Sequence, residues 1–296
     1  MIVCANPNQK RFNMNRTLLL NEIDALLNPS AYKDYAPNGL QIQGSDSITR
    51  IATAVTASRQ VIEAAADWGA HLLLVHHGYF WKGESEPITG IKYERIAALI
   101  RHDISLAAYH LPLDAHPTLG NNAQLGLKLG LTAQGQLPSE PLVWHGTSDC
   151  TTLAELAQRV ELVLGRAPLI IGDASAPVGK IGWCTGGAQG YLSNAAAFEL
   201  NTYISGEISE RTYHEARELG ISYLACGHHA TERYGVQALG EHLRDAFSLE
   251  YRFFDEDNPV WAEHKLDRPG HFLAAPFCAS IKKAPRSWGF LLIEQR

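Results

Sequence analysis

The chain has 296 residues, of which 46% are hydrophobic and 19% charged, a balance typical of a globular protein long enough to bury a full core. A formal net charge of −6 argues against duplex nucleic acid as the main ligand, because neutralising phosphates needs a basic surface. No apolar run approaches the ~18 residues that a membrane-spanning helix needs, and no secretory signal pattern is present. The five scattered cysteines indicate reduced thiols, so we expect a cytoplasmic protein without membrane contact.

Predicted helices and strands alternate through the first half of the chain. Apolar residues at helical spacing predict a helix over 17–28, and a loop with a Pro-Asn-Gly turn is expected over 31–44. The elements expected next are a strand over 51–55, a helix over 58–69, a buried strand over 70–75, a helix over 91–102 and a strand over 104–109. Such alternation is the signature of a parallel α/β sheet.

The second half of the chain repeats this order of elements. Residues 51–77 and 181–207 both run from a strand through Thr and a turn to an Ala-rich helix and a second strand. Residues 103–114 and 220–232 are both expected to form a strand that ends in His, with a carboxylate four residues later. An internal duplication explains the matching polar residues at strand ends, although unrelated parallel α/β units also share this order.

We therefore predict an α/β protein made of two similar lobes from an internal duplication. In both lobes the polar residues follow the carboxyl ends of parallel strands, where α/β sheets bind ligands. Pairing the repeats sets His76 opposite Glu207. The expected division is a first lobe over 14–125, a second lobe over 126–258, and extensions outside the core over 1–13 and 259–296.

Histidines and carboxylates gather at the predicted strand ends: His76, His77, His110, Asp114, Glu207, His228, His229 and Glu232. If a helix begins near Ala230, His228 and Glu232 stand one turn apart, with ~5–6 Å between their Cβ atoms. A His and a carboxylate so placed can bind one metal ion. A single His at a strand end is more often a hydrogen-bonded structural residue, but a group of this size at one sheet edge favours a metal site.

The adjacent pair His76 and His77 is harder to interpret. On an extended segment the two side chains point to opposite sides. They could therefore bind two neighbouring ions, or one could bind a metal while the other faces the core. Imidazole with carboxylate suits zinc, iron, manganese, cobalt or nickel rather than magnesium or calcium alone.

Other motifs are less specific. The glycine-rich segment 185–190 lies between a strand and a helix, where backbone N–H groups can hold phosphate, but an ordinary tight turn explains it equally well. Lys82 is a candidate anion contact or a solvated surface lysine. No G-x-S-x-G motif and no cysteine adjacent to a histidine is present, so the sequence offers no support for a nucleophilic Ser or Cys.

In combination, six segments resemble the Nif-three-like family of dinuclear-metal proteins, whose members are commonly described as GTP cyclohydrolase 1 type 2 homologues. The segments are YAPNGLQI (35–42), VHHGYFWKG (75–83), HLPLDAHPTLGNN (110–122), CTGGAQG (184–190), SGE (205–207) and CGHHATER (226–233). The resemblance covers residues 14–258 and implies two α/β lobes facing each other across a cleft that holds two metal ions. It also implies a homohexameric toroid. Many relatives carry a large insert between the lobes, for which the link at 125–150 is too short.

The resemblance also implies roles for individual residues. The implied metal ligands are His76, His77, Asp114, His228 and Glu232, with one carboxylate bridging the two ions. Beside them, His110 and Glu207 are candidates for acid–base catalysis or for support of the ligands. The expected cofactors are two divalent transition-metal ions per chain, ~3–4 Å apart.

The function expected from this resemblance is a metal-dependent hydrolase in which metal-bound hydroxide attacks a nucleotide or another small nitrogen-rich substrate. A metal-delivery protein, and a toroidal scaffold or regulatory protein without turnover, are the alternatives. The acid–base candidates His110 and Glu207, with Lys82 for anions, favour the hydrolase. A carrier should show an exposed and incomplete ligand set, and a scaffold would need no ligand set.

Overall fold

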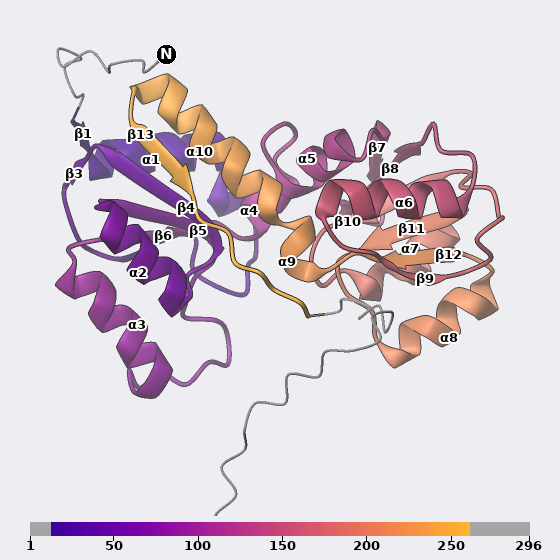
Figure 1. Cartoon of the computed structure of the whole chain (residues 1–296), viewed down its shortest axis with the longest axis horizontal. Coiled ribbons are helices and arrows are strands. Elements are labelled where there is room, and N and C mark those ends of the chain that lie inside the picture. Colours follow the sequence, from indigo (N-terminus) through magenta and orange to yellow (C-terminus); the bar gives the residue numbers. More distant parts are fainter. Residues whose placement is uncertain (1–12, 261–296) are drawn as a thin grey trace, which may run out of the picture. The chain divides into compact units, whose positions relative to one another are not determined.

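Two mixed β-sheets, each covered by helices on both faces, form the computed structural model of the chain (Figure 1). The structure describes residues 13–260, and these fall within one compact unit. The expected α/β class is therefore confirmed, in the form of two mixed sheets.

Parallel pairing dominates the first sheet. Its strands, in spatial order, are β13 (Glu250–Phe253), β4 (Arg50–Thr56), β5 (Leu72–His77), β6 (Ser105–Ala108) and β2 (Gly39–Ile42). The first four run parallel to their neighbours, and β2 pairs antiparallel with β6. The segment 31–44 is therefore not all loop as expected, because β2 obtains its hydrogen bonds from a strand more than sixty residues away in sequence.

Four helices cover the first sheet: α1 (Arg16–Leu27), α2 (Arg59–Trp68), α3 (Gly90–Arg101) and α10 (Arg233–Phe247). Alternate residues of β4 face opposite sides, so that Ile51 and Val55 pack with α1 and α10 while Ala52 and Ala54 pack with α2 and α3. Each face buries a separate apolar cluster.

Capping residues fix the ends of α2 where the sequence predicts them. The Ser58 side chain accepts a hydrogen bond from the backbone N–H of Val61, and Gly69 ends the helix with φ of 77°. A serine cap satisfies an N–H that has no partner within the helix, and glycine takes a left-handed conformation without steric cost. Helix α2 thus runs directly into β5, which ends at the two adjacent histidines.

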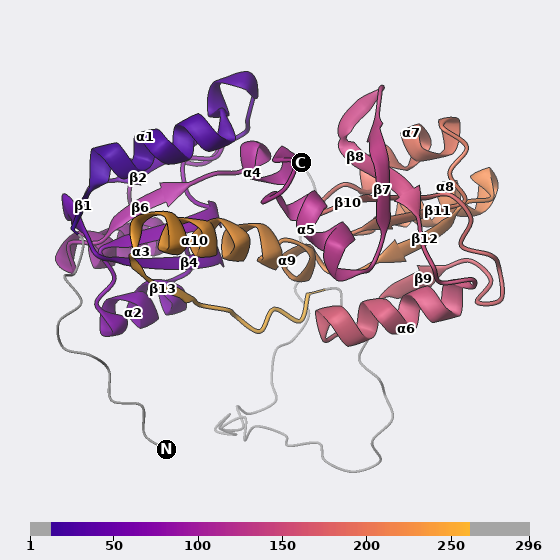
Figure 2. The same ribbon diagram turned by 90° about the horizontal axis from the view of Figure 1, so that it is seen from above.

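The second sheet has three central parallel strands. Its strands, in spatial order, are β7 (Thr132–Leu137), β8 (Glu140–Thr147), β10 (Ile181–Cys184), β11 (Thr202–Ser205), β12 (Ser222–Ala225) and β9 (Leu169–Ile171). Strands β10, β11 and β12 are parallel, and the other pairings are antiparallel. The helices are α5 (Asn121–Lys128), α6 (Leu153–Leu164), α7 (Leu192–Ala197) and α8 (Glu210–Leu219). Figure 2 shows α6 on one side of the sheet and α7 and α8 on the other, in agreement with two separate apolar clusters.

The two sheets share a core of three parallel strands, β4-β5-β6 in one and β10-β11-β12 in the other. In each sheet, an antiparallel strand lies next to the third of these parallel strands in space: β2 lies next to β6, and β9 lies next to β12. This correspondence agrees with an internal duplication, which stays a prediction.

The end of the described chain returns to the first sheet. Strand β13 pairs with β4, and Val236, Leu239 and Leu243 of α10 belong to the apolar cluster that covers β4. The expected second lobe, 126–258, assigned this helix and strand to the other sheet. The assignment needs correction, because sequence order alone does not show which sheet edge a terminal strand joins.

Short elements complete the fold. They are β1 (Met14–Asn15), β3 (Ser47–Ile48), η1 (Pro29–Ala31), α4 (Leu111–Ala115), η2 (Gln189–Tyr191) and α9 (His228–Thr231). The expected extensions over 1–13 and 259–296 lie outside the described residues, apart from residues 13, 259 and 260. None of the helices within residues 13–260 is long and apolar enough to span a membrane.

Candidate metal centre

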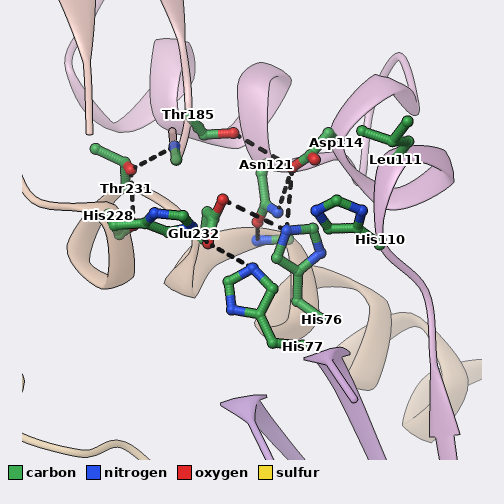
Figure 3. A network of polar contacts seen from close by, with 12 residues as sticks. His76, His77, His110, Leu111, Asp114, Asn121, Thr185, His228, Thr231 and Glu232 are labelled. Atoms are coloured by element: carbon green, nitrogen blue, oxygen red, sulfur yellow. Dashed lines mark hydrogen bonds and ion pairs between the residues drawn. The ribbon is translucent and has the colours of Figure 1, made fainter. Parts of the chain in front are cut away.

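Four imidazoles and two carboxylates meet where strands of both sheets end (Figure 3). The first sheet contributes residues at the end of β5 and after β6, and the second contributes residues after β12: His76 and His77, His110 and Asp114, and His228 and Glu232. Parallel strands present their carboxyl ends at one edge of a sheet, which explains why segments far apart in sequence converge.

Glu232 connects two groups of possible metal ligands. One group is His76, Asp114 and Glu232, and the other is His77, His228 and Glu232; within each, the ligand atoms lie within 4.8 Å of one another. The Glu232 Oε1 atom is 3.5 Å from His76 Nε2, and Oε2 is 3.3 Å from His77 Nε2 and 3.1 Å from His228 Nε2. The two oxygens of one buried carboxylate therefore face different groups.

The Nδ1 atoms of the four imidazoles all contact an oxygen, which leaves each Nε2 to face the cluster. His76 Nδ1 is 3.0 Å from the carbonyl oxygen of Tyr109, and His77 Nδ1 is 3.3 Å from the Thr56 hydroxyl. The other two contacts are His110 Nδ1 to Asp34 at 2.6 Å and His228 Nδ1 to Glu207 at 2.7 Å. Such outer contacts orient imidazole ligands and fix their tautomer.

Buried amide and hydroxyl groups hold Asp114 in place. The Asn121 amide donates to Asp114 Oδ1 at 2.8 Å, and the Thr185 hydroxyl donates to the same oxygen at 3.3 Å. The Asn121 oxygen in turn accepts the backbone N–H of Gly235 at 2.9 Å, so α5, α10 and the turn after β10 meet at this carboxylate.

The glycine-rich turn 185–190 packs directly against Glu232. At Gly186, where φ is 67°, a Cβ atom would overlap Glu232 Oε1. The backbone N–H of Gly186 donates to the Thr231 hydroxyl at 3.0 Å. This turn is therefore part of the scaffold of the cluster.

Burial and charge shift the pKa values of the cluster in opposite directions. Burial lowers the pKa of His77 to about 3, which favours the neutral imidazole that metals require. At His76 and His228 burial is outweighed by the nearby carboxylates, so each pKa rises to about 9. Burial raises the pKa of Asp114, whereas at Glu232 the surrounding imidazoles outweigh burial and lower it. The carboxylates thus favour positive charge on the imidazoles of His76 and His228.

The residues present fit a metal centre. His76 Nε2 and Glu232 Oε2 are buried and form no hydrogen bond of good geometry among residues 13–260, although ring nitrogens and carboxylate oxygens of the cluster lie 3.1–3.5 Å from them. Buried polar atoms are nearly always paired in native proteins, so orphaned atoms call for a missing partner. Mixed nitrogen and oxygen donors suit a divalent transition metal.

The structure brings all five predicted ligands together, and it places the neighbouring candidates around them. His110 joins His76 and His77 in a third group of close ligand atoms, and Glu207 contacts His228. His229 faces away, with Nε2 2.8 Å from Asp255. The ligand roles themselves stay a prediction.

The prediction that the side chains of His76 and His77 point to opposite sides of the strand is wrong. Their ring centroids are 4.5 Å apart, and both rings face the cluster. Strand β5 ends at His77, where the alternation of a regular strand no longer dictates side-chain direction.

Sequence reasoning missed the groups that orient the cluster. Asp34 and Thr56 lie outside the segments that carry the family resemblance, and Asn121 lies inside 110–122 but was given no role. All three contact partners that are brought close only by folding or by a local turn. The one signal for Asp34 was its place next to the segment 35–42, which carries the family resemblance.

A hollow of about 240 Å³ opens beside the cluster. His77, His228 and Glu207 line it from one side, and Asn258 and Val260 line it from the segment after β13. A larger hollow of about 650 Å³ beside β9 and α8 includes none of the cluster residues. The smaller hollow therefore gives a compact ligand access to the imidazoles of His77 and His228.

Comparison with known proteins places this arrangement in a family. The family model described as Duf34/NIF3 (NGG1p interacting factor 3) matches residues 14–259. A GTP cyclohydrolase 1 type 2 homolog of Neisseria meningitidis serogroup B is 51% identical over 235 residues, which are 79% of this chain and 94% of the relative. The homolog of that description from Escherichia coli K12 is 48% identical over 249 residues, 83% of this chain and 100% of the relative.

Solved structures support the same family placement. The structure of protein ybgI, described as of unknown function, superposes with a TM-score of 0.79 at 46% identity, covering 83% of this chain and 100% of that chain. A crystal structure from Thermus thermophilus gives a TM-score of 0.75 at 31% identity, with 83% of this chain and 99% of that chain covered. The chain belongs to the Duf34/NIF3 family, and it is a homologue of the proteins named GTP cyclohydrolase 1 type 2 homolog, with a ybgI-like structure.

Proposed function

We propose that the protein is a dinuclear-metal hydrolase acting on a nucleotide or another small nitrogen-rich substrate. The observation that carries the proposal is the pair of three-ligand groups that share Glu232. His76, Asp114 and Glu232 would hold one divalent ion, and His77, His228 and Glu232 the other. When bound, such a pair of ions lowers the pKa of water and polarises the bond to be hydrolysed.

The chain's own residues provide the remaining functions. Glu207 and Thr56 orient His228 and His77 through their Nδ1 atoms, and Asn121 orients Asp114. His110 is the candidate for moving a proton, since both three-ligand groups are complete without it. The names of the homologues support a purine nucleotide as the first substrate to test.

Metal analysis tests the ligand assignment. The purified chain should contain two transition-metal ions, and Asp114→Ala or His228→Ala should lose at least one. His110→Ala should keep its metal while turnover falls ~10²–10⁴-fold, the usual contribution of general acid–base catalysis. Absence of stoichiometric metal from the wild type, together with an unchanged metal content in His228→Ala, would contradict the proposal.

A turnover screen tests the reaction class. The fully metallated protein should hydrolyse at least one member of a panel of purine nucleotides and small amides. If it hydrolyses none, the metal-delivery alternative becomes the better account, and transfer of metal to an apo-acceptor is then the measurement to make. The deep burial of Asp114 and Glu232 favours retention of metal over delivery.

We also propose that the chain assembles as a homohexamer, on the strength of its family resemblance. Multi-angle light scattering at micromolar concentration should give about six times the mass of one chain. A monodisperse monomer would contradict this assembly.

A further inference from the structure

A buried carboxylate that belongs to neither ligand group contacts His110. The side chain of Asp34 is 3% exposed, and its Oδ1 is 2.6 Å from His110 Nδ1. Its other oxygen accepts the backbone N–H of Leu111 at 2.9 Å and the side-chain amide of Asn38 at 2.9 Å. These contacts fix the carboxylate in one position against the imidazole.

Asp34 can only accept hydrogen bonds in this environment. Burial raises its pKa, but the hydrogen bonds from His110 and Asn38 outweigh burial and lower the value to about 2. An ionised carboxylate has no proton to donate. The proton between Asp34 and His110 therefore belongs to Nδ1 of the imidazole.

The opposite ring nitrogen of His110 faces the metal centre. Within residues 13–260 its Nε2 has no hydrogen-bond partner. The His110 ring centroid lies 5.0 Å from that of His76. With the proton on Nδ1, Nε2 presents its lone pair to the cluster.

Backbone and aromatic contacts hold the ring in this orientation. The backbone N–H of His110 donates to the Asn38 side chain at 2.8 Å. The Trp81 ring packs edge-on against the His110 ring, with 4.9 Å between the ring centroids and an interplanar angle of 85°. The indole N–H of Trp81 donates a hydrogen bond to the Gly78 carbonyl at 3.1 Å. The two surrounding loops are joined, since the backbone N–H of Lys82 donates to the Tyr35 carbonyl at 2.7 Å.

We propose that Asp34 is a positioning residue, which holds His110 as the Nδ1–H tautomer with Nε2 directed at the metal centre. The role of His110 rests on the proposed function. There, Nε2 accepts a proton from the attacking water and returns it to the leaving nitrogen, so that the imidazole ends the cycle unchanged. A carboxylate that orients a proton-transferring histidine acts through tautomer and geometry rather than by taking the proton itself.

The tautomer can be measured directly in the full-length, zinc-loaded protein. Ring nitrogen signals are recorded by NMR with ¹⁵N-labelled histidine, and His110→Gln identifies the signals of His110. We expect a proton on Nδ1 in the wild type, and a shift of these signals in Asp34→Ala and in the nearly isosteric Asp34→Asn. The matched control is Asp255→Asn, which removes the carboxylate contact of His229 and should leave the His110 signals unchanged.

Two NMR results would overturn the proposal: a proton on Nε2 of His110 in the wild type, or His110 signals that do not change in either Asp34 variant. Elemental analysis separates this test from that of the hydrolase itself. Asp34→Asn should retain both ions while turnover falls. A 10–100-fold loss of metal affinity would instead make His110 a metal ligand and overturn its assigned role. If the tautomer is as expected but no substrate is hydrolysed, the positioning stands and the hydrolase fails.

Discussion

Glu232 is the residue on which both ligand groups depend, because each of its oxygens faces different imidazoles. Its side chain is 3% exposed and is confined by the turn at Gly186. A Cβ atom added at Gly186 must displace the carboxylate. The geometry of the centre is therefore sensitive to Gly186, although this residue offers no side-chain atom to a metal.

We expect Gly186→Ala to weaken metal binding. The new Cβ would overlap Glu232 Oε1, and φ of 67° adds strain for a residue with a side chain, which costs about 1–2 kcal/mol. Disturbing the support of a ligand typically lowers metal affinity ~10–100-fold. Competition with a chromogenic chelator measures the metal affinity of the variant and of the wild type. Gly190→Ala is the matched control, since a Cβ there meets nothing within 4 Å, and equal affinities in both variants would disprove the expectation.

A second residue-scale prediction concerns pH. His71 Nδ1 accepts the backbone N–H groups of Thr49 at 3.2 Å and Arg50 at 3.3 Å, so the fold requires a neutral ring. Burial, with the charge of Arg50, lowers the His71 pKa below 6.5, although Asp103 and Glu250 partly oppose this. The unfolded chain therefore binds this proton first as the pH falls, and the free energy of unfolding decreases below about pH 6.5.

His71→Asn isolates this contribution, because its side-chain oxygen can replace Nδ1 as the acceptor and does not titrate. Urea unfolding at pH 7.5 and pH 5.5 should show a smaller loss of stability in the variant than in the wild type. The other titrating groups contribute equally to both proteins and cancel. An identical loss in the two proteins would contradict the role of His71.

The sequence predicts which imidazoles and carboxylates meet in the cluster better than it predicts the groups that orient them. The spacing of His228 and Glu232 predicted their contact, which the structure confirms at 3.1 Å between Nε2 and Oε2. Asp34 contacts His110 across 76 positions of sequence, a pairing that no local pattern reveals. Alternation predicts side-chain direction within a regular strand, but His77 is the last residue of β5, so alternation does not fix its direction relative to His76.

At the scale of elements, buried parallel strands and capped helices could be predicted, and edge strands could not. Residues 72–75 of β5 form a continuous apolar run, and the capping residues of α2 can be recognised at both of its ends in the sequence. By contrast, β2 and β13 are four residues long and lie at sheet edges. Their pairing partners are set by tertiary packing, which a short segment does not encode.

Strand β13 should be essential to the first sheet. It pairs with β4, a strand whose residues from 51 to 55 are buried, and Tyr251 donates to the Gln237 carbonyl of α10. A chain ended after Leu249 would expose β4 as an edge, so we expect insoluble expression or loss of a cooperative thermal transition.

The matched truncation for comparison ends after Val260 and keeps β13. Its melting temperature should stay within a few degrees of the full-length protein, since the segment 259–296 is expected to lie outside the core. Thermal unfolding followed by circular dichroism measures both chains. Loss of soluble expression on removal of residues 261–296 alone would show that this segment contributes to the folded protein.

At the scale of the whole molecule, the candidate centre draws its ligands from both sheets. His76, His77 and Asp114 come from the first sheet, and His228 and Glu232 follow the last parallel strand of the second. Helix α10 then returns from this point to the first sheet. Metal bound at this centre would therefore contact parts of the chain that fold around different apolar clusters.

Metal should accordingly stabilise the entire described unit. A ligand present at 100–1,000 times its dissociation constant adds about 3–4 kcal/mol to the free energy of unfolding, which corresponds to roughly 6–16 °C for a chain of this size. Chelator-treated protein should thus melt at a lower temperature and recover when zinc, iron, manganese, cobalt or nickel is added. Calorimetry should show one transition that moves as a whole, because both sheets supply ligands.

The variant Glu232→Gln removes the carboxylate charge that the two groups of possible metal ligands share. It should therefore abolish most of the rise in melting temperature on metal addition. Glu63→Gln is the matched control, since Glu63 pairs with Arg59 on the exposed face of α2, away from the centre. A shift that persists in Glu232→Gln would mean that the metal binds elsewhere. If none of these metals moves the transition of the wild type, the cluster of imidazoles and carboxylates serves a purpose other than metal binding.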